Sequence, residues 1–296
     1  MTAERSRVER LAYEATVVLP PALRRHLFYA RHHRRFGRFR APRTFNEKVN
    51  WRILNDRRDL LAWTCDKLAM KDHARRVAPD LAVPATLWSG TDVGELMNAD
   101  LPDQWVLKPN HRTQLVHFGS RAALDVDHLR RVTSGWLRDR QGRVSAEWAY
   151  TRARPLLFVE ELIGSTGSPP ADFKVFVFDG VPRFVQVHLD RFGEHRAAFF
   201  DPAWSRLDFA RRDIPLAHEV PRPRRLEEML HAATRLGAGF DFMRVDLYDV
   251  EDTVWFGELT PYPGAGLTPF TPRRADELVG SLWTLPQLDT EPVSRR

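Results

Sequence analysis

Two acidic residues stand within the apolar stretch 242–260, which reads as two strands joined by a short turn. An unpaired carboxylate buried at Asp246 or Glu258 would be strongly destabilising. Hard cations such as Mg²⁺ prefer carboxylate and phosphate oxygens, so a magnesium site would account for both residues. Thr260 projects from the same strand face as Glu258 and could complete the site. The alternative is a plain ion pair, because Arg244 shares a strand face with Asp246.

The two carboxylates can bind one ion only if they lie on the same side of the hairpin. Asp246 and Glu258 both have even numbers. They therefore share a face only if the connecting loop has an odd number of residues or a bulge interrupts the pairing. We predict such an irregularity between Tyr248 and Thr253.

Lysine is rare in this basic chain, which has 45 Lys and Arg residues against 39 Asp and Glu and a net charge of +6. Lysine occurs only at Lys48, Lys67, Lys71, Lys108 and Lys174. Where a chain so rich in arginine has a lysine, the position could require a compact ammonium group that a guanidinium cannot replace. The alternative at each of the five positions is chance. The basicity itself indicates an anionic partner, which could be a nucleotide, a nucleic acid or an acidic glycan.

Short strands mixed with helices indicate an α+β fold with closely packed lobes. The sequence predicts helices at 44–54, 60–77, 124–140 and 224–236. It predicts strands at 83–88, 105–108, 156–162, 173–178, 183–189, 242–248 and 254–260. Asp179-Gly180 predicts the turn of a hairpin. Thr44 and Glu47 have the spacing of a capping box at the start of the first of these helices.

The N-terminal residues 1–43 look helical and strongly basic. Their arginines surround the apolar residues Leu27, Phe28, Tyr29, Phe36 and Phe39. This pattern fits a solvated helical arm that packs on the rest of the protein. It also fits a face that touches membrane phospholipid or an acidic polymer.

The 296-residue chain is long enough for one large or two medium domains. No apolar run approaches the ~20 residues of a membrane span, and the N-terminus lacks the features of a signal peptide. The single cysteine, Cys65, excludes an internal disulfide. We therefore expect a soluble protein of the reducing cytoplasm.

The order strand-Arg-x-Asp, turn, strand-Glu-x-polar resembles the metal end of the ATP-grasp superfamily, known from D-alanine–D-alanine ligase and glutathione synthetase. Within it, the chain is most similar to the TupA-like group, named for teichuronopeptide synthesis. Seven stretches carry the resemblance: TFNEKV from Thr44, DKLAMK from Asp66, LKPNH from Leu107, DFKVF from Asp172, DRF from Asp190, RVD from Arg244 and GELT from Gly257. With the Pro263-Gly264 turn they span about three-quarters of the chain, in fixed order.

The resemblance implies an ATP-grasp fold, in which two α+β lobes clasp ATP, preceded by a helical basic arm. It implies four parts. These are the arm at 1–43, an N-terminal subdomain at 44–105, a lid and hinge at 106–163, and a C-terminal subdomain with the metal and acceptor sites at 164–296.

The resemblance also implies which residues bind Mg-ATP. The residues that would bind ATP are Lys67, Lys108, Glu160, Glu161, Ile163, Asp172 and Lys174. The lysines would contact phosphates, the hinge 158–163 would hold the adenine amino group, and Asp172 and Lys174 lie where ribose and phosphate contacts occur. Asp246, Glu258 and Thr260 would bind Mg²⁺.

Catalytic and acceptor roles follow from the same resemblance. Arg244 would neutralise the developing acylphosphate, and backbone N–H groups near Gly264 could hold an oxyanion. A charged connection between two strands supplies candidates that could recruit an anionic acceptor: Arg191, His195 and Arg196. A solvated loop is the alternative for this connection.

One stretch departs from the family pattern. After His111 the family usually continues into a glycine-serine loop over the phosphates, whereas here Arg112-Thr113-Gln114-Leu115 follows. A loop poor in glycine cannot approach phosphate as closely. Either Arg112 and Thr113 supply the donors, or the lid closes differently, or catalysis is lost. We hypothesise that Arg112 is catalytic and closes over the γ-phosphate once nucleotide and acceptor are both bound.

The resemblance implies an ATP-dependent carboxylate–amine ligase that acts through an acylphosphate on an amino acid, a peptide or a uronic-acid glycan, in cell-wall or natural-product biosynthesis. An ATP-dependent glycan phosphotransferase or modifier on the same fold is one alternative. A catalytically silent module that binds a polyanion is another. The sequence has no zinc-ligand spacing and no aromatic RNA-binding motif, which argues against a nucleic-acid partner. A peripheral membrane contact through the basic arm stays open.

Overall fold

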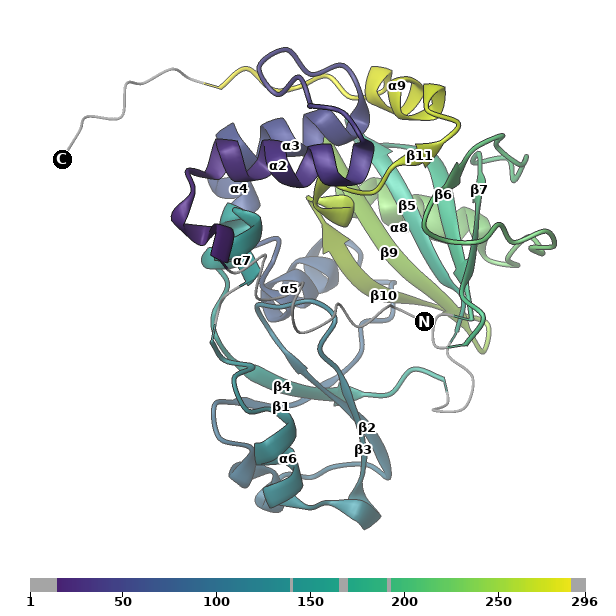
Figure 1. Ribbon diagram of the computed structural model, residues 1–296. Helices are drawn as coiled ribbons and strands as arrows, with labels where there is room; N and C mark the ends of the chain where they lie inside the picture. The colour runs from purple at the N-terminus through teal and green to yellow at the C-terminus, as the bar shows by residue number, and fades with distance from the viewer. Residues whose placement is uncertain (1–14, 139–140, 165–169, 191–192, 289–296) are drawn as a thin grey trace.

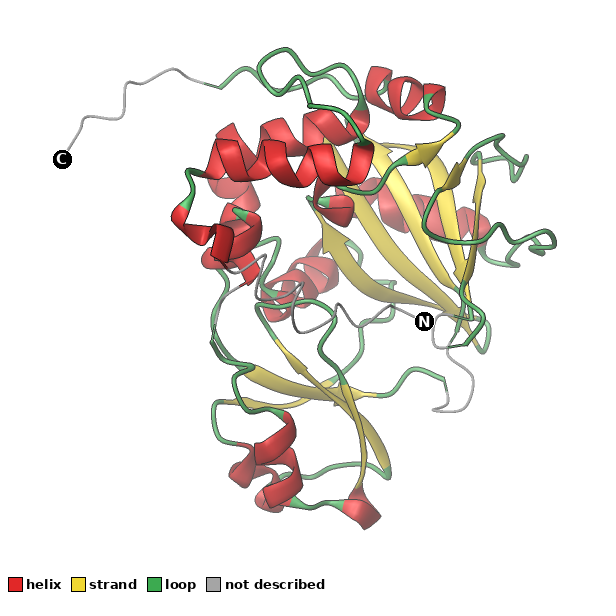
Figure 2. Cartoon of the chain, in the orientation of Figure 1, coloured by secondary structure: helices red, strands yellow, loops and turns green. Residues whose placement is uncertain are grey.

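Two antiparallel sheets organise the protein, whose computed structural model describes residues 15–138, 141–164, 170–190 and 193–288 (Figures 1 and 2). The five-stranded sheet has the order β10-β9-β5-β6-β7 and the four-stranded sheet the order β1-β4-β2-β3. The first contains β5 (Asp172–Phe178), β6 (Val181–Leu189), β7 (Arg196–Phe200), β9 (Phe242–Val250) and β10 (Thr253–Thr260). The second contains β1 (Thr86–Gly90), β2 (Gln104–Pro109), β3 (His117–Ser120) and β4 (Leu157–Glu161).

The remaining elements cover these sheets and connect them. A short ribbon pairs β8 (Ala210–Arg211) with β11 (Phe270–Thr271). The α-helices are α2 (Pro21–His33), α3 (Phe45–Asn55), α4 (Asp59–Ala62), α5 (Lys67–Val77), α6 (Val126–Val132), α7 (Gln141–Ser145), α8 (Leu226–Gly237) and α9 (Arg274–Ser281). Short 3₁₀ segments lie at Thr16–Val18, Val93–Asn98, Arg121–Ala123, Trp148–Thr151 and Pro263–Gly266. None of the helices within the described ranges has the length and apolarity needed to cross a bilayer.

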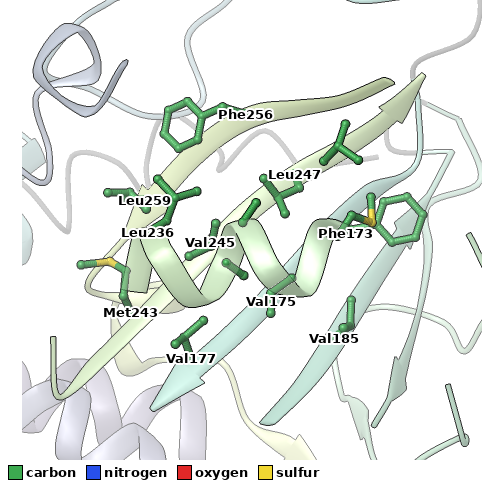
Figure 3. Packing of buried hydrophobic residues seen from close by; sticks show 14 of the residues in the cluster. Phe173, Val175, Val177, Val185, Leu236, Met243, Val245, Leu247, Phe256 and Leu259 are labelled. Carbon is green, nitrogen blue, oxygen red and sulfur yellow. The ribbon is translucent and has the colours of Figure 1, made fainter. Parts of the chain in front are cut away.

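The five-stranded sheet is covered on both faces, so every residue of β5 is buried. On one face Val175 and Val177 pack with Val245 beneath α8, which lies across the strands in Figure 3. On the other face, at one end of the sheet, Phe176 and its aromatic neighbours pack against Phe45 of α3. The rest of that second face carries polar side chains, and α8 lies on the opposite side of the sheet.

The predicted hairpin turn and capping box both form. The β5–β6 turn is Asp179-Gly180, with φ of 49° and 75°, as a tight hairpin turn requires. The capping box of α3 is also confirmed. The Glu47 N–H donates to Thr44 Oγ1 at 3.3 Å, and the Thr44 N–H donates to Glu47 Oε2 at 3.2 Å.

Two predicted helices are shorter than expected. The segment 60–77 divides into α4 and α5, because Asp66 accepts a hydrogen bond from the Ala69 N–H at 2.9 Å and thereby caps a new helix. The segment 124–140 is α-helical only over Val126–Val132. After Val132 the chain continues in turns.

Helix α5 lies between the two sheets in Figure 1. Its side chains contact both, because Lys67 pairs with Glu258 of β10 and Lys71 pairs with Glu160 of β4. It packs against β10 and α8, and the Leu259 N–H donates to Met70 Sδ at 3.4 Å. The start of α5 is also bound to the segment before β4, because the N-cap residue Asp66 accepts hydrogen bonds from the Arg154 guanidinium at 2.7 and 2.8 Å. The Leu68 N–H donates to the Asn110 side chain at 2.9 Å. One helix therefore connects both halves of the protein.

Candidate functional site

One row of polar side chains crosses the five-stranded sheet on the face opposite α8. The strand register places Glu258 opposite Asp246, Asp246 opposite Lys174, and Lys174 opposite Gln186. Directly opposite residues of neighbouring antiparallel strands share a face and lie within side-chain contact. The two carboxylates that the sequence singled out therefore converge.

Gly257 makes this convergence possible. The β9–β10 turn holds two residues, which would leave Glu258 and Asp246 on opposite faces. The register shifts by one residue at Gly257, and Glu258 then lies opposite Asp246. The irregularity that we predicted exists, but its predicted place between Tyr248 and Thr253 is wrong, because the tight turn there is regular.

Asp246 is buried and holds two cations. Lys174 Nζ donates to Asp246 Oδ2 at 2.6 Å and to Asp172 Oδ2 at 2.6 Å. Arg244 donates to the two Asp246 oxygens at 2.7 and 2.8 Å and to Thr260 Oγ1 at 2.9 Å. Burial alone would raise the pKa of Asp246, but Arg244 and Lys174 outweigh it and lower this pKa to about 2. The Arg244 ion pair that the sequence left open is therefore formed.

Glu258 is the more accessible carboxylate, with its side chain 28% exposed. Lys67 Nζ lies 3.3 Å from Glu258 Oε1. Together with Asp246 and the Thr260 hydroxyl, Glu258 offers oxygen ligands of the kind that Mg²⁺ binds. Within the described ranges no group of three or more His, Cys, Asp or Glu side chains could hold a metal by itself. The residues thus fit a magnesium ion that takes its remaining ligands from phosphate oxygens.

A second charged cluster lies on the four-stranded sheet around Glu160. This carboxylate is buried, and Lys71 Nζ contacts its Oε2 at 2.5 Å while Lys108 Nζ contacts its Oε1. Burial alone would raise the pKa of Glu160, but Lys108 and Lys71 hold this pKa below its usual range. Lys71 was not among the predicted site residues. Two signals could have found it: it is one of five lysines in an arginine-rich chain, and it ends the stretch DKLAMK that carries the resemblance.

Four of the five lysines thus pair with carboxylates of this region, and Lys48 does not. Lys48 lies on α3 and is half-buried. Its ammonium donates to the carbonyl of Gly280, in the last turn of α9, at 2.9 Å and to the carbonyl of Trp283, just after α9.

The other predicted nucleotide contacts lie at the ends of strands. Glu161 is the last residue of β4, and its Oε1 accepts a hydrogen bond from the Ala85 N–H at 2.6 Å. Ile163 follows β4 and is partly buried. Arg112 follows β2, and its Nη1 donates to the carbonyls of Gly135 and Arg138 at 3.2 and 3.5 Å. The guanidinium of Arg112 thus lies against the segment that follows α6.

The predicted acceptor residues fall partly within the structure. Arg191 lies outside the described residues. His195 and Arg196 line a cavity of about 630 Å³, and the exposed Arg196 pairs with Glu194 at 2.7 Å. His195 Nε2 lies 2.7 Å from Nδ1 of His188, a buried residue of β6 that no sequence pattern singled out. Burial, followed by the positive charge of Lys174, lowers the pKa of His188 far below its usual range.

Gly264 lies in an unusual turn after β10. Gly264, Ala265 and Gly266 all have positive φ, at 53°, 53° and 62°. Such backbone is strained for alanine and needs surrounding support. The Ala265 carbonyl accepts from the Arg25 guanidinium, and the Gly266 carbonyl accepts from the Asn50 amide at 2.9 Å. Helices α2 and α3 therefore hold this turn in place.

Comparison with known proteins assigns the chain to a family. A family model described as TupA-like ATPgrasp matches residues 47–284. Among curated proteins none matches the chain.

Several solved structures are similar at low identity. The ATP-grasp ligase PsnB with a phosphomimetic variant of its minimal precursor, Mg and ADP has 14% identity and a TM-score of 0.40, over 68% of this chain and 51% of that one. The D-alanine–D-alanine ligase from Bacillus anthracis with ATP has 15% identity and a TM-score of 0.39, over 68% of this chain and 55% of that one. The D-alanine–D-alanine ligase from Helicobacter pylori has 13% identity and a TM-score of 0.40, over 75% of this chain and 62% of that one. The chain spans about half to three-fifths of the length of these structures.

Proposed function

The chain belongs to the TupA-like ATP-grasp family, and from this premise we propose that it is an ATP-dependent carboxylate–amine ligase. On this proposal it binds Mg-ATP between the two sheets, with residues 106–163 as lid and hinge. The acceptor is an amino acid, a peptide or a uronic-acid glycan.

The observation that carries the proposal is the arrangement of charge on the two sides of α5. Asp246 and Glu258 converge at the edge of the five-stranded sheet, and Lys71 and Lys108 converge on the four-stranded sheet. Phosphoryl transfer needs little from the protein except positioning and charge neutralisation. One side offers oxygen ligands for a cation, and the other offers ammonium groups for phosphates.

Each charged residue has a role in this scheme. Asp246 and Glu258 would hold Mg²⁺ with the phosphates, and the ion would draw charge from the transferring phosphoryl group. Lys71 and Lys108 would bind phosphate oxygens as point charges. Lys174, which already contacts Asp172 and Asp246, would fix the position of both carboxylates.

The reaction would proceed in two steps. The acceptor carboxylate oxygen attacks the γ-phosphorus, the bond to the β–γ bridging oxygen breaks, and ADP leaves. The amine nitrogen then attacks the acyl carbon and loses a proton, while inorganic phosphate leaves with the electron pair of the C–O bond. Arg244 is held beside Asp246 and Thr260, where it would neutralise charge on the acylphosphate. The turn at Gly264 would lie against the acceptor.

The test is ADP formation by the full chain with Mg-ATP and with amino acids, short peptides and uronic acids, alone and in pairs. The proposal expects turnover that needs both a carboxylate and an amine and that is lost in Asp246→Asn. The control is Arg130→Ala, which removes an exposed charge on α6. ADP formed with a single hydroxyl acceptor and no amine would favour the glycan phosphotransferase. Nucleotide binding without turnover on any pair would favour the silent binding module.

A further inference from the structure

A second cavity, of about 490 Å³, opens where the end of α2 meets the segment after β8. It is lined by Arg31, His32, Arg34 and Arg212. All four residues are basic, and they come from two segments that lie far apart in the sequence. The volume is in the range of pockets that hold small molecules, roughly 300–1,000 Å³.

The backbone at this cavity is fixed in a defined geometry. Arg34 ends α2 in the left-handed conformation, with φ of 59°, and its N–H donates to the Ala30 carbonyl at 2.9 Å. The Arg212 guanidinium donates to the His32 carbonyl, which anchors it to the last turn of α2. Carbonyls at a helix C-terminus attract cations, so basic residues from α2 itself have an ordinary structural explanation. Arg212 comes from another segment and adds positive charge beyond that.

Two of the arginines that line this cavity, Arg34 and Arg212, differ in their pairing from their neighbours in the sequence. Arg35 pairs with Glu47 at 2.6 Å, and Arg211 pairs with Asp213 at 2.5 Å. The adjacent residues Arg34 and Arg212 form no ion pair with any residue that the structure describes. An arginine fork matches the geometry of a carboxylate or a phosphate. Within the described ranges neither fork has a carboxylate partner, so both can bind an anion from outside.

Helix α2 borders the turn after β10. Arg25, near the start of α2, donates to the Ala265 carbonyl, and the Gly266 backbone lies close enough to His33, at the end of α2, to act on the pKa of that ring. Burial, followed by the positive charges of Arg35, His32 and Arg212, lowers the pKa of His33 to about 4, in keeping with a positive field there. The basic cavity thus adjoins the turn that the proposed function places beside the acceptor.

We propose that this cavity is an oxyanion subsite for the acceptor, in which Arg34 and Arg212 bind a carboxylate or phosphate group remote from the reacting carboxyl. The inference rests on the proposed function for the identity of the bound molecule. It does not need that function for the binding itself. The N-terminal helix α2 is then part of substrate recognition.

The experiment measures binding of three probes by calorimetry, with the nucleotide site filled by excess Mg-AMPPNP. Trigalacturonate carries carboxylates, inorganic tripolyphosphate carries phosphates, and maltotriose of similar size is neutral. We expect one of the two anions to bind and maltotriose not to bind. The anion that binds identifies the group as carboxylate or phosphate.

The variants are Arg34→Gln and Arg212→Gln, with Arg40→Gln as matched control. Arg40 is an exposed arginine of the same basic arm and does not line the cavity. We expect each cavity variant to weaken anion binding at least tenfold and the control to leave it unchanged. Arg34 forms no side-chain hydrogen bond with the residues that the structure describes, so its replacement should not disturb folding, which a melting curve checks.

Two outcomes would overturn the subsite: no anion binding by the wild type, or equal affinity in the wild type and both cavity variants. Nucleotide binding is measured separately for each protein and should not change in the variants. A wild type that binds the anion but does not bind Mg-AMPPNP would refute the proposed ligase and leave the subsite standing.

Discussion

Glu258 lies directly opposite Asp246 across the β9–β10 pair because Gly257 stands between paired positions as an extra residue. A Cβ at Gly257 would come within 2.9 Å of the Asp246 carbonyl oxygen and 2.9 Å of the Tyr248 ring. The backbone there cannot shift without moving Asp246 itself. The geometry of the two carboxylates therefore depends on one residue that has no side chain.

We expect Gly257→Ala to weaken Mg-ATP binding at least tenfold, about 1.4 kcal/mol. Overpacking at this point should also cost about 1–3 kcal/mol of unfolding free energy. Titration calorimetry and urea denaturation measure the two effects. Glu258→Gln, which keeps the size of the side chain and removes its charge, should also weaken Mg-dependent binding. A Glu258→Gln variant that binds Mg-ATP normally would exclude Glu258 as a metal ligand.

Lys71 and Lys108 should both contribute to nucleotide affinity. Replacing either with Met removes one charge-assisted phosphate contact, which is about 1.5–3 kcal/mol, or a ten- to hundredfold rise in Kd. Lys174→Ala should have a similar effect on affinity. It should also destabilise the fold, since it leaves Asp172 and Asp246 without a shared cation.

Lys48→Ala is the control for these lysines. It should leave the nucleotide Kd unchanged and lower the unfolding free energy by about 1 kcal/mol, because two carbonyls lose a donor. If the Lys71 and Lys108 variants keep the wild-type Kd as well, the space between the sheets is not a nucleotide site.

Arg112→Gly should reduce the rate of ligation far more than it reduces ATP affinity. In the structure its guanidinium rests on the carbonyls of Gly135 and Arg138. On our hypothesis it leaves them to close over the γ-phosphate, a contact made mainly in the transition state. We expect at least a tenfold fall in kcat with a nearly unchanged Kd for ATP. Arg112→Lys, which keeps the charge but loses the fork, should recover only part of the rate. Normal turnover of Arg112→Gly with saturating acceptor would rule the idea out.

Asp276 should make the fold less stable as the pH rises from about 4 to about 6. This carboxylate of α9 accepts hydrogen bonds from the backbone and side chain of Asn46 at 3.0 and 3.0 Å. Burial nevertheless raises the pKa of Asp276 to about 6, compared with about 3.9 in an unfolded chain. Between these values the folded state binds more protons than the unfolded state, so its stability falls with rising pH, by up to about 2–3 kcal/mol.

The variant Asp276→Asn keeps the hydrogen-bond acceptor and removes the titration. The difference in unfolding free energy between variant and wild type should therefore shift in favour of the variant between pH 4 and pH 7. Asp59→Asn, at an exposed position at the start of α4, is the control. Taking the difference removes the opposite trend from Asp246, whose lowered pKa adds stability above pH 4. A constant difference across this range would contradict the assignment.

Features written in a few adjacent residues could be predicted from the sequence. The turn at Asp179-Gly180, the capping box of Thr44 and Glu47, and the need for a bulge near Asp246 all depend on local geometry. The place of the bulge could have been found too, because an isolated glycine inside a strand, here Gly257, often marks one.

Contacts between distant segments could not be predicted in this way. The pairing of Lys71 with Glu160 joins residues 89 positions apart, and only the tertiary fold brings them together. The contact of His188 with His195 depends likewise on where the β6–β7 connection folds. Sequence periodicity assigns a residue to a face of its own element, but does not identify the element that covers that face.

Helix α5 also sets the distance between two lysines of the candidate site. Lys67 and Lys71 are separated by one helical turn, and the first pairs with Glu258 of one sheet while the second pairs with Glu160 of the other. Residues four apart on a helix lie about 5–6 Å from each other, so the pitch of the α-helix fixes how far apart the two lysine positions stand. One residue inserted between them would rotate the second by about 100° and remove it from its carboxylate. One turn of α5 therefore sets the distance between the lysine that contacts Glu258 and the lysine that contacts Glu160. Substituting the lysines does not change this distance, because the helix backbone determines it.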